Sequence, residues 1–197
     1  ANNVAYWFGS QSVLYVVAVV LSVSAVVGLN VTLNVMCAAD ILFLSMETLM
    51  PVRAASAYQR FGQAGLDAYL RRALVLGSQV TIGLAGIAGM WSEQWPRILY
   101  GETYRGYGWV IWWWGGYYLL GMLQRPTISA LRVLGDTRSI YLASSTGALA
   151  TMVLAYPVTK AYGFGGAMLV LCLTQCLVLC SLRIRYTSTA VGMHKPI

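Results

Sequence analysis

The residues with the clearest chemical potential are polar side chains inside apolar stretches. Five of them lie on one side of a predicted helix. At 100° per residue, they fall within an arc of about 140°: Asn30, Asn34, Cys37, Asp40 and Glu47. A charged side chain at the centre of a bilayer costs ~2.5–3.5 kcal/mol, so such groups usually face a water-filled cavity or a partner. We therefore predict that Asp40 lines a cavity. Glu47 either lines the same cavity or pairs with Arg53 near the end of its helix.

A deep arginine would supply the opposite charge. Arg125 precedes Pro126, and a helix over residues 109–134 places it ~13 Å from the helix end at ~1.5 Å per residue. By the same count from residue 52, Glu47 is ~8 Å and Asp40 ~18 Å deep. We hypothesise that Arg125 faces a central cavity, pairs with Asp40 or Glu47 at rest, and is available as a bidentate donor to a lipid pyrophosphate.

Two alternatives concern the same polar set. If the helix ends at Gln124, Arg125 is an ordinary basic residue at the membrane surface. Gln175 lies in another apolar stretch. It either bonds a neighbouring helix or lines the same path as Arg125.

Enzymatic chemistry has few candidates in this chain. The sequence holds six acidic residues and a single histidine, His194, in the C-terminal tail, and it lacks the short motifs of metalloproteases, serine hydrolases and phosphate loops. Cys172, Cys176 and Cys180 recur at four-residue spacing, which is typical of small residues at a helix–helix contact; a thiolate metal site is the alternative. We expect no enzyme activity, no cofactor and no metal, with a membrane transferase as the remaining enzymatic possibility.

The elements that position these residues are apolar and long. The chain has 197 residues, of which 58% are hydrophobic and 10% are charged, and its mean hydropathy is +0.65. About 20 apolar residues cross a bilayer as a helix. We predict an all-α integral membrane protein, a single domain over residues 1–197, with six transmembrane helices at about 12–29, 31–51, 73–91, 109–134, 140–156 and 164–182.

The basic residues behind the net charge of +7 are distributed unevenly between the two predicted sides of the membrane. With six spans, one side of the membrane receives Arg53, Arg60, Arg71, Arg72, Arg125, Arg132, Arg138, Arg183, Arg185 and Lys195, and the other receives Arg97, Arg105 and Lys160. The positive-inside rule then places both termini in the cytoplasm. This pattern predicts contact with membrane lipids and no binding of nucleic acid.

Residues 100–120 form an aromatic segment in which nine of twenty-one residues are Tyr or Trp. Tyr and Trp collect at the membrane interface, where the ring is apolar and one edge is wet. We expect residues 100–114 to anchor the outer ends of the third and fourth helices. A carbohydrate-stacking surface is the alternative, because aromatic rings also stack on sugars.

Glycine and proline punctuate the expected spans. We predict that Pro51 ends the second helix and that Pro157 and Gly163 bracket the short outer turn between the last two. Between the second and third helices, the expected membrane-surface residues are Phe61, Leu66, Tyr69 and Leu70. The third helix is expected to pack closely through Gly77, Gly83, Gly86 and Gly89.

Four short stretches together resemble a known family. They are Val27-Gly28 with Ala38-Ala39, Pro51 and Ala54-Ala55; Leu99-Tyr-Gly-Glu-Thr-Tyr104; Leu131-Arg-Val-Leu-Gly-Asp-Thr-Arg138; and Tyr162-Gly-Phe-Gly-Gly-Ala167. Their order and spacing resemble the C-terminal half of a lipid-linked oligosaccharide (O-antigen type polysaccharide) flippase of the MATE/MOP exporter superfamily. The sequence departs from the family pattern at Leu29 and Asn30, where the family usually has a tyrosine.

The resemblance implies one six-helix lobe of a transporter in a bacterial inner membrane. It implies that the protein exports lipid-linked oligosaccharide for polysaccharide or lipopolysaccharide biosynthesis by rocking one lobe against another. One lobe encloses half a cavity, so the expected partner is an N-terminal lobe, encoded before Ala1, or a second copy of this chain. The alternatives are a cation-coupled multidrug antiporter of the same superfamily and a membrane scaffold subunit that transports nothing.

The charge pattern generates a test of topology. In intact cells, an impermeant thiol reagent should label cysteines introduced at Glu102 or Lys160, which are expected outside. Cysteines at Arg60 or Arg138 should stay unlabelled until the membrane is permeabilised. Labelling of Arg60→Cys in sealed cells would overturn the predicted orientation.

Overall fold

The chain is all helical in the part that the structure describes. The computed structural model describes residues 2–101 and 106–192, which are 93% helix and contain no strand. In chain order the helices are α1 (Asn2–Val20), α2 (Val23–Val35), α3 (Cys37–Met90), α4 (Gln94–Tyr100), α5 (Gly108–Val133) and α6 (Thr137–Gly192). Arg105, His194 and Lys195 lie outside the described residues.

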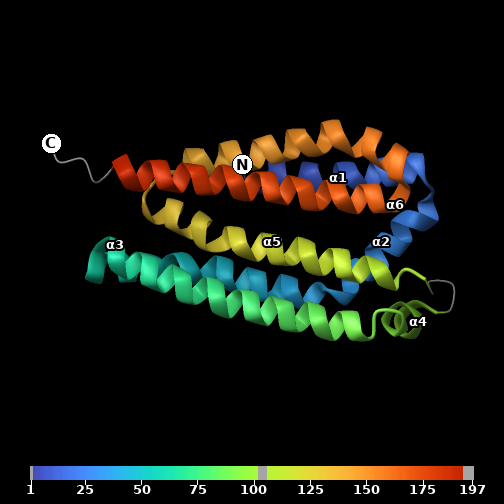
Figure 1. Ribbon diagram of the computed structural model, residues 1–197, viewed down its shortest axis with the longest axis horizontal. Helices are drawn as coiled ribbons and strands as arrows, with labels where there is room; N and C mark the ends of the chain where they lie inside the picture. The colour runs from blue at the N-terminus through green and yellow to red at the C-terminus, as the bar shows by residue number, and fades with distance from the viewer. Residues whose placement is uncertain (1, 102–105, 193–197) are drawn as a thin grey trace.

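The two longest helices, α3 and α6, are helical hairpins (Figure 1). Gly62 breaks α3 and Gly163 breaks α6, each with a positive φ, of 63° and 62°. A residue without a Cβ adopts this conformation at little cost, so glycine reverses the chain at both points. Each hairpin therefore has a first arm before its glycine and a second arm after it.

Helix α5 lies at the centre of the bundle. It packs against both α3 and α6, while α1 packs mainly against α6. The second arm of α3 runs antiparallel to α5, with Gly89 against Trp112 and Gly77 against Met122. The buried core includes Ile111 and Met122 of α5. Most of the packing between the two hairpins therefore runs through α5.

Much of the apolar surface is exposed. Two helices of the described residues, Ala39–Met90 and Thr137–Ser188, are long and apolar enough to cross a membrane. Large apolar side chains project from them, including Ile41, Leu44, Val153 and Ile184, each at least 64% exposed. Such a large exposed apolar surface is typical of contact with a membrane or a protein partner.

Basic residues collect at one end of the bundle. The Gly62 turn, the α5–α6 connection and the C-terminal end of α6 share that end (Figure 1). On or near them are Arg53, Arg60, Arg71, Arg72, Arg132, Arg138, Arg183 and Arg185. The Gly163 turn and α4 lie at the opposite end, with Lys160 and Arg97. The chain thus brings together in space the basic segments that the sequence assigned to one side.

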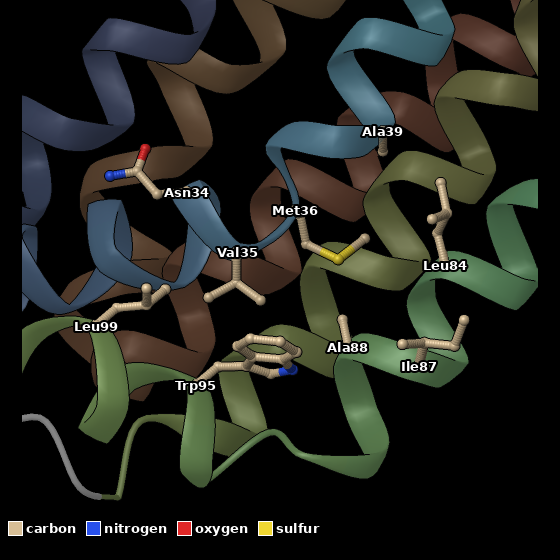
Figure 2. Close-up of a pocket in the computed structure, with 9 residues that line it drawn as sticks. All are labelled: Asn34, Val35, Met36, Ala39, Leu84, Ile87, Ala88, Trp95 and Leu99. Atoms are coloured by element: carbon tan, nitrogen blue, oxygen red, sulfur yellow. The ribbon is translucent and has the colours of Figure 1, made fainter.

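The predicted boundary between the first two helices was wrong. The chain breaks at Leu21-Ser22 and again at Met36, as Figure 2 shows for Met36, and not near residue 30. Ser22 caps α2 by accepting a hydrogen bond from the Ala25 backbone N–H at 3.2 Å. Hydropathy cannot locate a turn inside a continuous apolar run, whereas a capping serine can.

Two prolines do not end their helices as predicted. Pro51 lies inside α3, which continues to the Gly62 turn, and Pro157 lies inside the first arm of α6. A proline removes one backbone hydrogen bond and can kink a helix without ending it. The glycines make the turns, so the second and fifth helices extend further than predicted.

Part of the expected membrane-surface segment is core instead. Leu66 is fully buried and Leu70 is 8% exposed, in a cluster with Ala54 and Ala130, while Phe61 stays 72% exposed. Because the second arm of α3 begins directly after Gly62, Leu66 and Leu70 already lie on its inner face. The segment after Pro51 is therefore a continuation of two packed arms.

The structure limits the aromatic and glycine predictions to some of their residues. Trp109 and Trp112 are exposed, but Trp114 is 5% exposed and its indole Nε1 donates to Thr32 Oγ1 at 3.1 Å. Three adjacent Trp point in different directions on a helix, so one of them must enter the core. Added Cβ atoms at Gly83 and Gly86 would meet no atom within 4 Å, so these two glycines do not form the expected packing groove. Residues 102–105 of the family-like stretch lie outside the described residues.

The α6 turn generates a test with a matched control. A Cβ at Gly166 would collide with the Val158 carbonyl oxygen, whereas a Cβ at Gly165 would meet nothing within 4 Å. Gly166→Ala should lower the free energy of unfolding by about 1–3 kcal/mol. Gly165→Ala should leave it unchanged or raise it by about 0.5–1 kcal/mol. Unfolding in detergent micelles measures both; equal effects would contradict the close approach of the two arms.

Candidate functional site

The candidate site is a pair of polar contacts between the first arm of α3 and α5. Tyr118 lies 78 positions after Asp40, and Arg125 lies 78 positions after Glu47. This constant separation means that the two helices run parallel. The contacts are seven residues apart on each helix, about two turns, so both pairs fall on the same faces. We call them the Asp40–Tyr118 contact and the Arg125–Glu47 contact.

In the Asp40–Tyr118 contact, the Tyr118 hydroxyl donates to Asp40 Oδ2 at 2.9 Å. The Tyr118 side chain is 3% exposed, while Asp40 is exposed. The Phe43 ring packs on Tyr118 with 5.4 Å between ring centroids. The buried Tyr118 hydroxyl thus makes a charge-assisted hydrogen bond to the exposed Asp40 carboxylate. Such a bond is stronger than one between two neutral groups.

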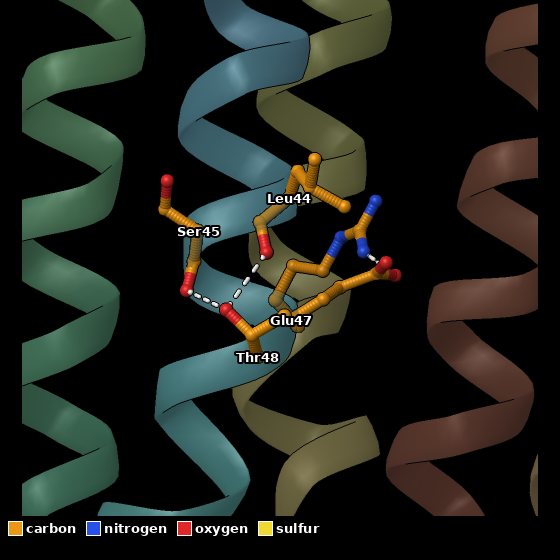
Figure 3. Close-up of polar contacts among 5 residues, drawn as sticks. Leu44, Ser45, Glu47 and Thr48 are labelled. Carbon is orange, nitrogen blue, oxygen red and sulfur yellow. Dashed lines mark hydrogen bonds and ion pairs between the residues drawn. The ribbon is translucent and has the colours of Figure 1, made fainter.

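In the Arg125–Glu47 contact, an Arg125 guanidinium nitrogen pairs with the Glu47 carboxylate. Figure 3 shows the Glu47 side chain extending from α3 toward the side on which α6 lies. The Arg125 side chain is 22% exposed and the Glu47 side chain is 46% exposed. The guanidinium also lies 4.9 Å from the Phe43 ring centroid, a cation–π distance. One aromatic ring therefore contacts both polar pairs.

The alternative in which the helix ends at Gln124 is wrong. Helix α5 continues to Val133, so Arg125 lies eight residues, ~12 Å, from its end. The neighbouring Thr48 hydroxyl bonds the Leu44 and Ser45 carbonyls of its own helix at 3.3 and 3.0 Å (Figure 3). Glu47 is thus the side chain of this turn that reaches across to α5.

Both helices carry a proline next to the ion pair. Pro51 lacks the N–H that would bond the Glu47 carbonyl four residues earlier, and Pro126 directly follows Arg125. Loss of an i to i−4 hydrogen bond lets a helix bend at that turn. The ion pair therefore lies where α3 and α5 are both locally easier to bend.

A third polar contact joins α5 to α6. The Gln124 side-chain amide donates to Gln175 Oε1 at 2.6 Å and to the Gln175 backbone carbonyl at 3.0 Å. Gln124 is 7% exposed. Gln175 thus bonds a neighbouring helix, which is one of the two predicted alternatives. Gln124 directly precedes Arg125 on α5, but the two side chains lie on different faces of that helix.

The predicted polar stripe is divided by the helix break at Met36. Asn30 and Asn34 lie on α2, and the Asn34 amide donates to the Tyr100 hydroxyl at 2.9 Å. Asp40 lies in the first turn of α3, and not at the expected mid-helix depth. The sequence prediction assumed one continuous helix from residue 31, and Met36 ends that continuity. The structure pairs Arg125 with Glu47, whereas Asp40 bonds Tyr118.

Sequence reasoning missed three contributors: Phe43, Tyr118 and Gln124. The seven-residue spacing from Asp40 to Glu47 is matched by that from Tyr118 to Arg125. This repeat was a usable signal for two parallel helices in register. Phe43 carried no such signal, because an aromatic in an apolar run is expected in any core.

The described residues contain no group of three His, Cys, Asp or Glu side chains that could hold a metal ion. On the cysteine stripe, Cys172 is half-buried and packs against the core, while Cys176 and Cys180 are exposed. Cys172 therefore has the predicted packing role. Among the described residues, Cys176 and Cys180 do not pack against another helix of this chain.

The geometry of the ion pair is suited to binding an anion. A guanidinium with a partly exposed face is neutralised by a carboxylate that is itself half exposed to the surroundings. An incoming anion with two oxygens can take the place of Glu47 on Arg125, because guanidinium presents paired donors. Comparison of the chain with family models, curated proteins and solved structures finds no match in any of the three.

The ion pair generates a double-mutant test of stability. Arg125→Gln and Glu47→Gln should each destabilise the folded chain, because each removes one side of the ion pair. The double variant should lose less than the sum, by about 1 kcal/mol for a pair of this exposure. Glu93 is exposed beyond the far end of α3, so Arg125→Gln with Glu93→Gln should be additive within about 0.5 kcal/mol. Additivity in the Arg125–Glu47 cycle would show that the pair contributes no coupling.

Proposed function

We propose that this chain is one six-helix lobe of a membrane transporter for a lipid-linked oligosaccharide. In this proposal, the lobe rocks against a second lobe and moves the lipid's pyrophosphate past Arg125. The observation that carries the proposal is the Arg125–Glu47 contact. It puts a partly exposed ion pair about 12 Å from the end of α5, in a bundle with few other charged side chains. Ionisable groups in such places usually mark a substrate or ion path.

The membrane setting follows from the hairpins. Six segments would span the bilayer: α1, the two arms of α3, α5, and the two arms of α6. Helix α5 has 26 residues and α1 has 19, close to or above the ~20 that a span needs. The basic end would face the cytoplasm of a bacterial inner membrane, and α2 and α4 would lie at the outer end.

The proposed binding step is an exchange of anions on Arg125. At rest, Glu47 neutralises the guanidinium, so the empty site carries no net charge from this pair. A pyrophosphate presents two or more oxygens in the geometry that guanidinium favours, and it displaces Glu47. The flanking prolines would let α3 and α5 bend as Glu47 leaves. Gln124–Gln175 would hold α5 to α6 while this happens.

A second lobe is part of the proposal. Asp40, Glu47 and many apolar side chains are exposed on this chain, and half-exposed carboxylates are poorly tolerated against lipid tails. The two carboxylates would instead face a water-filled cavity shared with a second lobe or with a second copy of this chain.

A cation-coupled drug antiporter is the second candidate. It is favoured by one observation: Asp40 and Glu47 are both exposed carboxylates on the same arm. In that reading a proton or Na⁺ binds the carboxylates, and Arg125 orients Glu47. The two functions differ in the side chain that matters for binding: Arg125 in the flippase, and Asp40 or Glu47 in the antiporter.

The test is the binding of a fluorescent polyprenyl pyrophosphate to the chain in phosphatidylcholine nanodiscs. Arg125→Gln should weaken binding about 10- to 100-fold, the range for lost hydrogen bonds to a charged group. Glu47→Gln should bind as well as the unaltered chain or more tightly, because the competing carboxylate is gone. Arg132→Gln, one residue from the end of α5, is the matched control and should bind normally.

The outcomes separate the two candidates. Unchanged binding by Arg125→Gln would contradict the flippase proposal. Binding of a cationic drug that is lost in Asp40→Asn or Glu47→Gln, but kept in Arg125→Gln, would favour the antiporter. Thermal unfolding of each variant in the same nanodiscs controls for misfolding.

A further inference from the structure

A groove lies between the two arms of α3, toward the basic end of the bundle. Its volume is about 190 Å³. Figure 3 shows Ser45, one of its lining residues, on the opposite side of the first arm from Glu47, so the groove is separate from the Arg125–Glu47 contact. Its lining residues nearest to the turn between the arms are Arg53 and Tyr69. Farther from the turn its walls are mostly apolar, from Met46, Leu49, Met50 and Ala73.

Arg53 brings to this groove a positive charge that forms no ion pair with a carboxylate of the described residues. Glu47, its predicted partner, pairs with Arg125 instead. Asp67 is the only acidic residue between positions 48 and 92, and it accepts a hydrogen bond from the Tyr186 hydroxyl at 2.6 Å. The arm that carries Arg53 therefore has a cation at the end of an apolar groove and no anion of its own to match it.

Three arginines lie at the same height on the α3 hairpin. The chain reverses at Gly62. Arg53 comes nine residues before this turn, and Arg71 and Arg72 come nine and ten residues after it, so the three are level. One turn farther from Gly62, the groove residue Leu49 is 56% exposed. A change from basic to apolar surface at one height is typical of the boundary between lipid headgroups and acyl chains.

An anionic phospholipid matches both parts of the groove. Tyr69 interacts electrostatically with Arg53, and a lipid phosphate can accept hydrogen bonds from the Arg53 guanidinium and the Tyr69 hydroxyl together. Arg72 directly precedes Ala73 of the groove and is exposed, so it adds a second positive charge beside the phosphate. An acyl chain fits the apolar walls, which a free phosphate ion would leave empty. Basic pockets between transmembrane helices bind anionic lipid headgroups in this way.

We infer that this groove binds one anionic phospholipid of the leaflet at the basic end, with the lipid phosphate on Arg53 and one acyl chain between the two arms of α3. The lipid fills the space that the two arms leave open and neutralises the arginine there. This inference does not depend on the transport proposal. It requires only that the chain is in a membrane.

The test is photo-cross-linking of the full chain in phosphatidylcholine nanodiscs. The probe is a trace of phosphatidylglycerol with a diazirine in the middle of one acyl chain. Peptide mass spectrometry should place the cross-links on residues 45–50 and on Ala73. A probe with the same chains and a phosphatidylcholine headgroup should label these positions about ten-fold less, since each nearby arginine favours an anionic lipid about five-fold. Excess inorganic phosphate should not displace the phosphatidylglycerol probe.

Two pairs of variants complete the test. Arg53→Gln should lower phosphatidylglycerol labelling about ten-fold, the effect of a lost hydrogen bond to a charged group. Arg60→Gln removes the same charge from the same face of the first arm, ~10 Å nearer the turn and about one Debye length away, so it should change labelling less than about two-fold. Ser45→Phe fills the groove and should also lower labelling, whereas Thr48→Phe, on the same arm but outside the groove wall, should not.

Each part of the inference has an outcome that would overturn it. Equal losses in Arg53→Gln and Arg60→Gln would show a general attraction of charge and no site. Equal labelling by the two headgroups would show that the groove does not recognise an anion, and displacement by inorganic phosphate would show an ion site without a lipid. Unchanged labelling in Ser45→Phe would place the acyl chain outside the groove, whatever the result at Arg53.

Discussion

The parallel contact between the first arm of α3 and α5 is the interaction on which the rest of the arrangement depends. Helix α5 touches both hairpins, so its register on α3 decides which side chains meet between them. That register is fixed twice, seven residues apart, by Asp40–Tyr118 and Arg125–Glu47. A shift of α5 by one residue would rotate Tyr118 and Arg125 by about 100° away from Asp40 and Glu47. Both polar contacts would then be lost together, at a greater cost than one poor apolar contact.

Phe43 shows how packing and charge are coupled in this contact. Its ring lies against Tyr118 and beneath the Arg125 guanidinium. The same side chain thus fills apolar volume and presents a π face to a cation. The prolines beside the ion pair add local freedom to bend the backbone. A packed helix pair with a proline in each helix is a suitable arrangement for the anion exchange that we propose.

The two ends of the bundle differ in character. One end carries the arginines around the Gly62 turn and the α5–α6 connection. The other carries the exposed aromatics and the short helices α2 and α4. At this second end the chain forms two short helices between the long ones. The break at Met36 and the shortness of α4 leave a pocket that the protein's own side chains do not fill.

The sequence by itself determined the class of fold and the residues with chemical potential. Apolar runs predicted helices, and the exposed apolar arms agree with that composition. The charge of Arg125 inside α5 indicated that it needs a partner. These conclusions depend on local composition and spacing, which are fully present in the chain. The family, the number of spans and the transported substrate remain predictions.

Only the tertiary structure decided where the helices break and which polar groups meet. Hydropathy could not distinguish a turn at Ser22 from one near Asn30, because both lie in one apolar run; the structure places the turn at Leu21-Ser22, where Ser22 Oγ accepts from the Ala25 backbone N–H. Prolines 51 and 157 looked like helix ends, but each lies inside a helix with buried residues on both sides of it: Met50 and Ala54, and Ala155 and Thr159. Whether Arg125 pairs with Asp40 or with Glu47 depends on the register of α3 against α5. That register is set by side chains distant in sequence, so no local pattern contains it.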